Sequence, residues 1–382
     1  MPERSAASSY DVGAQRFQRS VPKIGAEPDL AGPWSMVNQS NSKRKAVSEM
    51  FILPEHMRPT VTHNDYTDLE IPVIDVSALF DPPQHDEKVM EGLVAQVRDA
   101  CLHWGFFQIV NHGIPEELLE RFHGQGKQFF ALPFAEKMKV ARQQGQYTGY
   151  GHATVKKGDV RPWSEGFYFA NDGSTAEFAK KLWPEDTNDD FLNSYSEYNE
   201  KVQGLSECLM RIIVDGLDVD PAYFETFSKH AGGLLRWNFY PACPEPQKTL
   251  GLKPHTDFNL LTVLHQGDVG GLQIEKDGKW IPVRPRPGAL AVNIGDTLQV
   301  LTNGKYKSVP HQAVVNATQS RISSAYFYEA LPSTVIVPHP DLVDENNPLQ
   351  YEPFTGEAYR VYKQTQFLNT LEHFVRKKPD AE

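Results

Sequence analysis

The spacing of apolar residues changes character along the chain and predicts helices first and a β-rich region later. In the first part, apolar residues recur every three or four positions, which is typical of amphipathic helices. Three helices are predicted in this way, over about 86–103, 116–131 and 189–215. Short apolar runs at 71–76, 106–111 and 167–169 predict strands between them. The N-terminal part is therefore predicted to be α/β.

From about 232 to 340 the chain consists of short apolar runs separated by Gly, Pro, Asn and Asp. This pattern is typical of an antiparallel sandwich or barrel. A last helix is predicted over about 355–376. We therefore expect an α+β protein with the following parts: an irregular arm at 1–65, an α/β region at 66–230 that packs on the barrel, the barrel itself at 231–340, and a helical segment at 341–382.

Composition and charge narrow the function classes. The 382 residues include 49 acidic and 38 basic side chains, so the net charge of −11 argues against general binding to nucleic acid or membrane surfaces. No apolar run approaches the roughly 20 residues that cross a bilayer, and no secretory signal begins the sequence, so we expect a cytoplasmic protein. Three scattered cysteines, Cys101, Cys208 and Cys243, make a disulfide framework or a thiolate zinc site improbable. A metal would then be bound by histidine and carboxylate, which favours iron, manganese or zinc.

Three pairs of polar residues interrupt the apolar strands of the second half at a spacing of two. They are Asn238 with Tyr240, His255 with Asp257, and Arg321 with Ser323, and His311 lies between the last two pairs. Residues two apart on a strand face the same side of the sheet, so these side chains are expected to point into the barrel. Burying them there is costly unless they meet a ligand or one another.

The chemistry of these residues suits iron and a 2-oxo acid. His255, Asp257 and His311 form a two-histidine, one-carboxylate set, which leaves three metal positions open for a bidentate ligand and oxygen. Arg321 can grip a carboxylate with two parallel hydrogen bonds, and Ser323 adds a third contact. Each motif alone is weak, because a surface histidine or an ion-paired arginine is the commoner explanation. Together, in this order, they predict an iron(II) oxygenase that uses 2-oxoglutarate.

Long stretches of the chain resemble the plant-type 2-oxoglutarate/iron(II)-dependent dioxygenases, which include gibberellin oxidases, flavonol synthase and anthocyanidin synthase. The resemblance covers about residues 50–375. It is carried by WGFFQIVNHGIP, RWNFYPACPEP, LKPHTDFNLLTVLHQGDVGGLQI and RISSAYFYEA, among other stretches. It implies a distorted double-stranded β-helix (jelly roll) with surrounding helices.

The resemblance also implies roles for single residues. His255, Asp257 and His311 match the iron ligands, Arg321 and Ser323 match the 2-oxoglutarate clamp, and Asn238 and Tyr240 match further co-substrate contacts. The cofactors implied are Fe(2+) and 2-oxoglutarate, with ascorbate as reductant. Substrate and O2 would be converted to a hydroxylated or desaturated product, succinate and CO2. Gln312 follows His311 where the family commonly has Arg, and Ala242 replaces a common Pro.

The substrate is predicted only as a small apolar, polycyclic metabolite. Candidate contacts are aromatic residues near the barrel mouth and residues that continue the inward parity of Arg321, namely Tyr147, Phe167, Phe169, Phe327 and Glu329. The aromatic residues fit equally well as core. Residues 163–167 resemble gibberellin 3-oxidases and favour a diterpenoid acid, whose carboxylate would find a base in Lys156, Lys157 or Arg161. Residues 327–329 instead resemble the flavonoid enzymes.

Three other function classes stay open on the sequence. One is an iron(II) oxidase of the same fold that does not consume 2-oxoglutarate, since such enzymes also carry R-x-S. A second is a small-molecule-binding protein without catalysis, which would be expected to have lost a metal ligand. A third is a metal-independent or zinc-binding jelly-roll protein. Regiochemistry and oligomeric state do not follow from the sequence.

Overall fold

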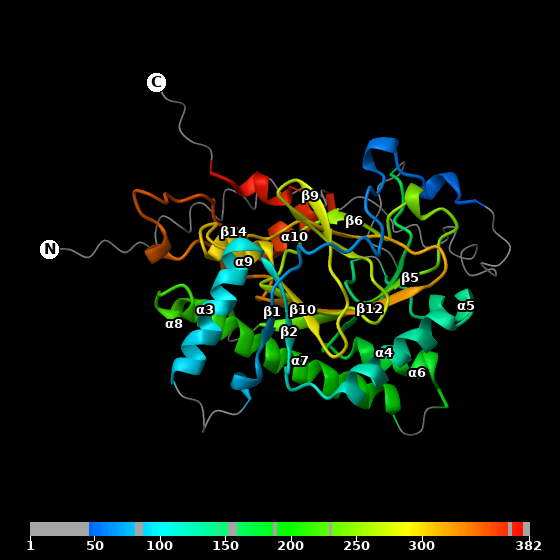
Figure 1. The fold of residues 1–382 in the computed structure, drawn as a ribbon. Helices are drawn as coiled ribbons and strands as arrows, with labels where there is room; N and C mark the ends of the chain where they lie inside the picture. Colours follow the sequence, from blue (N-terminus) through cyan, green and yellow to red (C-terminus); the bar gives the residue numbers. More distant parts are fainter. Residues whose placement is uncertain are drawn as a thin grey trace.

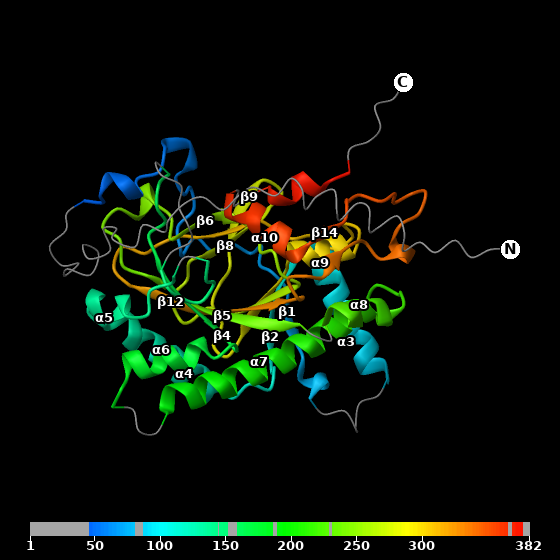
Figure 2. The ribbon, with the colours of Figure 1, turned by 180° about the vertical axis from the view of Figure 1, so that it is seen from behind.

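Two β-sheets form the centre of the molecule, and helices cover the outer side of the larger one (Figures 1 and 2). The structure is a computed structural model. It describes residues 46–80, 87–143, 145–151, 159–185, 189–228, 231–365 and 369–376. Residues 1–45 of the arm expected at 1–65, and the basic residues Lys156 and Lys157, lie outside the described residues.

The larger sheet has eight strands in the order β1-β2-β10-β7-β12-β5-β4-β3. Their bounds are β1 Val73–Asp75, β2 Phe106–Val110, β3 Gly149–Tyr150, β4 Glu165–Ala170, β5 Gly232–Tyr240, β7 Leu261–His265, β10 Leu290–Ile294 and β12 Arg321–Glu329. Four of these strands come from the N-terminal region. The predicted strand at 71–76 is shorter, and Val73 and Asp75 are exposed because β1 is the edge strand.

The smaller sheet has the order β6-β11-β8-β9 and faces the larger one. Its strands are β6 Leu252–His255, β8 Leu272–Lys276, β9 Lys279–Pro282 and β11 His311–Ala313. The two sheets enclose the interior of a distorted double-stranded β-helix, in agreement with the expected α+β jelly-roll class. A third, two-stranded sheet pairs β13 Val335–Ile336 with β14 Phe354–Thr355.

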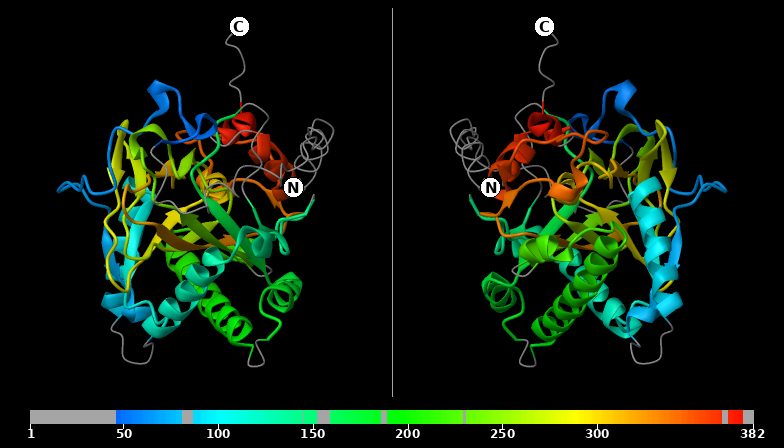
Figure 3. Two further views of the ribbon diagram at one scale, coloured as in Figure 1. Left: turned by 90° about the vertical axis from the view of Figure 1, so that its right-hand side faces the viewer. Right: turned by 90° about the vertical axis from the view of Figure 1, so that its left-hand side faces the viewer.

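The three helices predicted for the N-terminal region are present with nearly the predicted bounds. The helices of the N-terminal region are α3 Glu87–His103, α4 Glu116–Ala131, α5 Phe134–Met138, α6 Ser174–Leu182, α7 Asp190–Asp215 and α8 Pro221–Ser228. Helices α4 and α7 pack against each other and against the outer face of the larger sheet (Figure 3). Their apolar faces and the outward side chains of β4, β5 and β12 form the main core, which includes Phe122, Phe129, Tyr198 and Trp237.

The C-terminal helix is shorter than predicted. Helix α10 spans Gly356–Thr365, and a separate 3-10 helix spans Thr370–Phe374. Asn369 has a φ of 62° at the start of that turn, a conformation that an α-helix cannot continue through. The turn lets Phe374 pack on Tyr359 and Phe354. One further short helix, α9 Asp296–Leu301, follows β10.

Candidate metal and co-substrate site

A pocket of about 220 Å³ lies between the two sheets, and it contains every one of the three predicted polar pairs together with His311. The larger sheet contributes Asn238, Tyr240, Arg321 and Ser323, and the smaller sheet contributes the two histidines. Asp257 lies in the segment that follows β6. These side chains thus lie on one interior surface, as the alternation of side chains along the strands predicts for those on β5 and β12.

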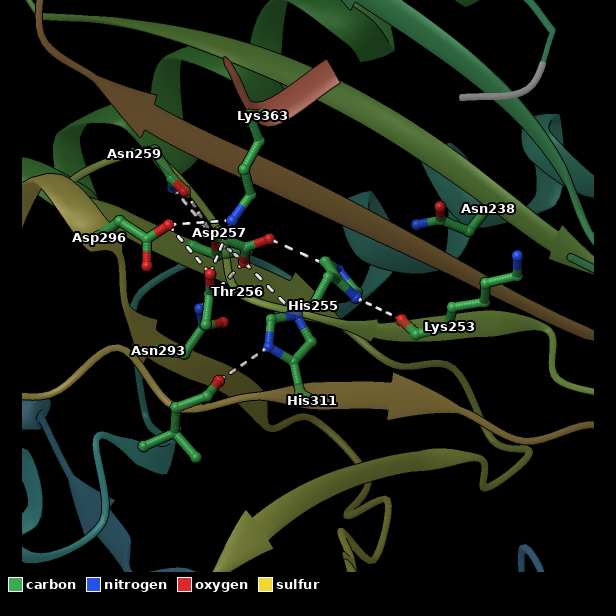
Figure 4. Close-up of polar contacts among 12 residues, drawn as sticks. Asn238, Lys253, His255, Thr256, Asp257, Asn259, Asn293, Asp296, His311 and Lys363 are labelled. Atoms are coloured by element: carbon green, nitrogen blue, oxygen red, sulfur yellow. Dashed lines mark hydrogen bonds and ion pairs between the residues drawn. The ribbon is translucent and has the colours of Figure 1, made fainter. Parts of the chain in front are cut away.

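His255, Asp257 and His311 form a compact cluster of potential metal-binding atoms (Figure 4). One ligand atom from each residue lies within 4.8 Å of the others. The two histidines face each other because His311 on β11 pairs directly with His255 on β6. Each histidine Nε2 is 3.7 Å from an oxygen of Asp257, Oδ1 for His255 and Oδ2 for His311.

Backbone carbonyls fix the tautomer of both histidines. Nδ1 of His255 lies 2.8 Å from the carbonyl of Lys253, and Nδ1 of His311 lies 3.2 Å from that of Val309. A carbonyl can only accept, so each Nδ1 carries the proton and each Nε2 presents a lone pair to the centre of the cluster. Burial, together with the neighbouring His311, lowers the pKa of His255 to about 3, which keeps this ring neutral. These are the donor properties that Fe(2+) requires.

Hydrogen bonds hold the carboxylate of Asp257. Its Oδ2 accepts from the hydroxyl of Thr262 at 2.6 Å and from the amide of Asn293 at 3.0 Å. Burial acts to raise the pKa of Asp257, but His311, His255 and these two donors outweigh it and lower the pKa to about 2. Thr262 on β7 pairs with Asn293 on β10, so one register places both donors beside the carboxylate.

A second set of contacts reaches this centre from the C-terminal helix. Lys363 on α10 donates to the Thr256 hydroxyl at 2.7 Å and pairs with Asp296 at 3.0 Å (Figure 4). Asp296 also accepts from Tyr359 at 2.6 Å and from Thr256 at 3.0 Å. The sequence reasoning missed Lys363, Thr262 and Asn293, because no local pattern links these residues to the histidines.

The buried end of β12 has the properties of a carboxylate site. Strands β5 and β12 pair Arg321 with Tyr240 and Ser323 with Asn238, so the four side chains share one face. The Nε of Arg321 donates to the Val269 carbonyl at 3.0 Å, whereas its buried Nη2 has no hydrogen-bond partner among the described residues. Oδ1 of Asn238 is likewise buried and unpartnered within the described part of the chain. The unpartnered guanidinium nitrogen of Arg321 is a donor that suits the distal carboxylate of 2-oxoglutarate.

The predicted substrate residues divide into two groups. Phe327 and Glu329 continue along β12 and line the pocket, as their parity predicted. The placement of Phe167 and Phe169 in the pocket was wrong. Both are fully buried on the other face of β4, where they pack on Trp237 and Phe129.

The prediction for β4 was wrong because it assigned the wrong face of this strand to the pocket. Its register with β5 places Tyr168 opposite Arg236, and these two side chains line the pocket. Tyr147 is 43% exposed and lies outside the pocket, with its ring 5.0 Å from the guanidinium of Arg360. Arg161, expected as a possible base for a carboxylate, is not among the residues that line the pocket.

Arg236 is a pocket residue that the sequence reasoning missed. Its side chain is buried, with an exposed fraction of 8%, and its guanidinium stacks 4.7 Å from the Tyr168 ring. Nε has no hydrogen-bond partner, and the described residues place no carboxylate in an ion pair with it. The signal was available, since Arg236 continues the inward parity of Asn238 and Tyr240.

Comparisons with known proteins agree with this geometry. Residues 231–330 match the model of the 2OG-Fe(II) oxygenase superfamily, and residues 71–186 match that of the non-haem dioxygenase in morphine synthesis N-terminal family. The chain is 37% identical to jasmonate-induced oxygenase 2 of Arabidopsis thaliana over 86% of its own length and 88% of the relative's. It is 35% identical to gibberellin 20 oxidase 1-B of Triticum aestivum, over 87% and 92% of the two chains.

A solved structure extends the similarity to the whole fold. The crystal structure of JOX2 in complex with 2OG, Fe and JA matches 90% of this chain and 97% of that chain, with a TM-score of 0.78 and 34% identity. Among the described residues no helix is long and apolar enough to cross a membrane. The chain therefore belongs to the 2-oxoglutarate/iron(II) oxygenase superfamily, as a dioxygenase that depends on Fe(2+) and 2-oxoglutarate and acts on a small molecule with O2.

Proposed function

We propose that this dioxygenase hydroxylates or desaturates a small apolar metabolite that carries a carboxylate. The single observation that carries the substrate class is Arg236, a buried guanidinium that lines the pocket and has no carboxylate partner among the described residues. A buried cation without a counter-ion is destabilising, and the Tyr168 ring stacked on Arg236 carries no negative charge, so an anionic ligand best explains a guanidinium at this position.

The residue roles follow from the pocket. His255, Asp257 and His311 would hold Fe(2+), and Arg321 and Ser323 would bind the distal carboxylate of 2-oxoglutarate, with Asn238 and Tyr240 beside it. When bound, iron and 2-oxoglutarate supply the activation of O2 and release succinate and CO2. The protein's part is to orient both ligands and to keep water away from the reacting carbon.

The rest of the pocket selects the substrate. Phe327, Leu234 and Tyr168 supply an apolar surface next to Arg236. A gibberellin-type or jasmonate-like acid has a carboxylate on an apolar body and fits this combination, and the curated relatives include gibberellin 20 oxidases and jasmonate-induced oxygenases. A flavonoid lacks the carboxylate that Arg236 favours. The buried guanidinium of Arg236 therefore favours an acid over a flavonoid as substrate.

The test is turnover on matched acids and esters. The enzyme, Fe(2+), ascorbate and 2-oxoglutarate are incubated with a library of apolar plant acids and with their methyl esters. Products are sought as mass shifts of +16 or −2, with succinate measured in parallel. We expect acids to be converted with stoichiometric succinate, esters to be poor substrates, and Arg236→Gln to lose the preference for acids while retaining formation of the iron–2-oxoglutarate complex.

Two results would contradict the proposal. Product formation without succinate would show an oxidase that does not consume 2-oxoglutarate. Equal conversion of acids and esters by the wild type, with Arg236→Gln indistinguishable from it, would show that the substrate carries no carboxylate at this position. His311→Ala serves as the negative control, because it should abolish turnover of every compound.

A further inference from the structure

Glu329 lies at the boundary between the inner pocket and a second, outer hollow. The outer hollow is lined by surface segments that include Tyr147, Asn171, Leu331 and Arg360. Leu234 and Glu329 line both cavities, whereas Arg360 lines only the outer one. The Glu329 carboxylate forms an ion pair with Arg360 on α10, so a residue of both cavities is paired with a residue of the outer one.

The Glu329–Arg360 pair is largely removed from water. The side chains are 11% and 16% exposed. The Arg360 guanidinium lies 4.7 Å from the Phe258 ring and 5.0 Å from the Tyr147 ring, and its Nε has no hydrogen-bond partner among the described residues. Two aromatic rings and one carboxylate therefore hold this cation in place, and Glu329 separates its charge from the inner pocket.

The other charged residues of the inner pocket, apart from Arg236, each have a partner or a proposed role. Burial raises the pKa of Glu329 to about 7, an effect that Arg360 opposes and Asp257 reinforces. Asp257 belongs to the metal cluster, Arg321 to the co-substrate end, and Lys363 is paired with Asp296. Among the pocket-lining residues that the structure describes, the cation left for a substrate is Arg236.

The spacing of these groups along the sheet matches the length of a small metabolite. Strand β12 pairs Ala325 with Arg236, Phe327 with Leu234 and Glu329 with Gly232. Residues two apart on a strand are separated by roughly 6.6 Å, so the Arg236 and Glu329 positions are roughly 13 Å apart. An acid bound at Arg236 would lay its apolar body on Phe327 and Leu234 and bring its far end to Glu329.

We propose that Glu329 is a specificity-determining residue that restricts the pocket to substrates with a single carboxylate. Its carboxylate neutralises Arg360 and opposes a second negative charge at the far end of the substrate, whereas a neutral hydroxyl or carbonyl is accepted there. This inference rests on the proposed function, in which the first carboxylate binds Arg236.

The test compares three ligands of equal chain length on the enzyme loaded with Fe(2+) and 2-oxoglutarate under anaerobic conditions. The probes are decanoate, 10-hydroxydecanoate and decanedioate, and binding is measured by the change in the visible iron–2-oxoglutarate band. The wild type should bind decanedioate roughly tenfold more weakly than the other two, because a second carboxylate meets that of Glu329. Glu329→Gln should abolish this difference or reverse it, since Arg360 becomes available. In the double variant with Arg360→Gln, the gain for decanedioate should disappear.

Different experimental outcomes distinguish a failure of the Glu329 proposal from a failure of the carboxylate-substrate proposal. If Arg236→Gln weakens all three ligands but Glu329→Gln leaves their relative affinities unchanged, the role of Glu329 is wrong and the carboxylate proposal stands. If Arg236→Gln changes nothing, or no probe binds the wild type, both fall. If Glu329→Gln does not fold, measurements on the wild type at two pH values still test the role of Glu329. The decanedioate-to-decanoate affinity ratio must be higher at about pH 6.5 than at about pH 8, since protonation removes the same charge; a constant ratio overturns the inference.

Discussion

Replacing Thr262 by valine should weaken iron binding while leaving the fold intact. The Thr262 hydroxyl donates to Oδ2 of Asp257 at 2.6 Å and itself accepts from the Asn259 amide at 3.0 Å. Valine keeps the shape and the β-branched geometry but removes the donor. The carboxylate then depends on Asn293 alone to hold Oδ2, with a hydrogen bond of 3.0 Å.

The size of the effect follows from the kind of bond lost. A hydrogen bond to a charged group contributes about 1.5–3 kcal/mol, and about 1.4 kcal/mol corresponds to a tenfold change in affinity. Since Asn293 still restrains the same oxygen, the lower end applies, and we expect the dissociation constant for Fe(2+) to rise about tenfold. Substitutions beside metal ligands commonly weaken binding by about 10- to 100-fold, which agrees with this value.

The assay is an anaerobic Fe(2+) titration at saturating 2-oxoglutarate, followed by the visible band of the ternary complex. Thr262→Ser retains the donor and is the matched control, expected to bind iron as the wild type does. Thermal unfolding of the metal-free variants shows whether any loss is merely global. If Thr262→Val and Thr262→Ser bind iron with the same affinity as the wild type, the hydroxyl does not position Asp257 and the reasoning is refuted.

Three further predictions concern the co-substrate end, the core and pH. Arg321→Ala should raise the 2-oxoglutarate concentration needed for half-maximal turnover by at least about tenfold while iron binding without 2-oxoglutarate persists; an unchanged requirement would place the clamp elsewhere. Phe167→Ala should lower the free energy of unfolding by about 3–5 kcal/mol in denaturant titrations, whereas Phe327→Ala should mainly weaken substrate binding; the opposite pattern would reverse the two assignments. Because Glu329 becomes anionic as the pH rises through about 7, affinity for a dicarboxylate should fall relative to that for a monocarboxylate across that range, and in Glu329→Gln this ratio should not change with pH; a ratio that varies equally in both proteins would contradict the assignment.

Parity along single strands predicted much of the site. It brought Asn238, Tyr240, Arg321 and Ser323 to one surface and extended correctly to Glu329. Parity is informative because side chains alternate between the two faces of a strand. Once one residue is known to face the pocket, the facing of every other residue on that strand follows.

Parity gives no prediction for a strand on which no residue is known to face the pocket. On β4 the aromatic residues Phe167 and Phe169 were predicted as substrate contacts, but the register with β5 turns them toward the helices and turns Tyr168 inward. A shift of one residue exchanges the two faces of a strand. Both faces of β4 carry apolar side chains, so its sequence does not distinguish the face toward the pocket from the face toward the helices.

Contacts between segments that are distant along the chain could not be predicted from the sequence. Lys363 and Arg360 approach the pocket because α10 lies against the barrel, about a hundred residues from Asp257 along the chain. The end of α10 shows the same limitation. The apolar pattern of 355–376 suits one helix, but the packing of Phe374 on Tyr359 requires a break.

The pairing of β5 with β12 also implies that co-substrate and substrate recognition can change separately. In the proposed assignment, one end of this ladder, at Arg321 and Ser323, would bind 2-oxoglutarate, and the other end, at Phe327 and Glu329, would contact the substrate. The two ends are about 13–26 Å apart along the strand, so substitutions at one leave the geometry of the other largely unaffected. The residues that would hold the iron lie beside the substrate end of the ladder, where Thr262 pairs with Phe327 and its hydroxyl holds the carboxylate of Asp257. New substrate preferences within this fold are therefore expected to arise from Arg236, Phe327 and Glu329, while the metal and clamp residues stay the same.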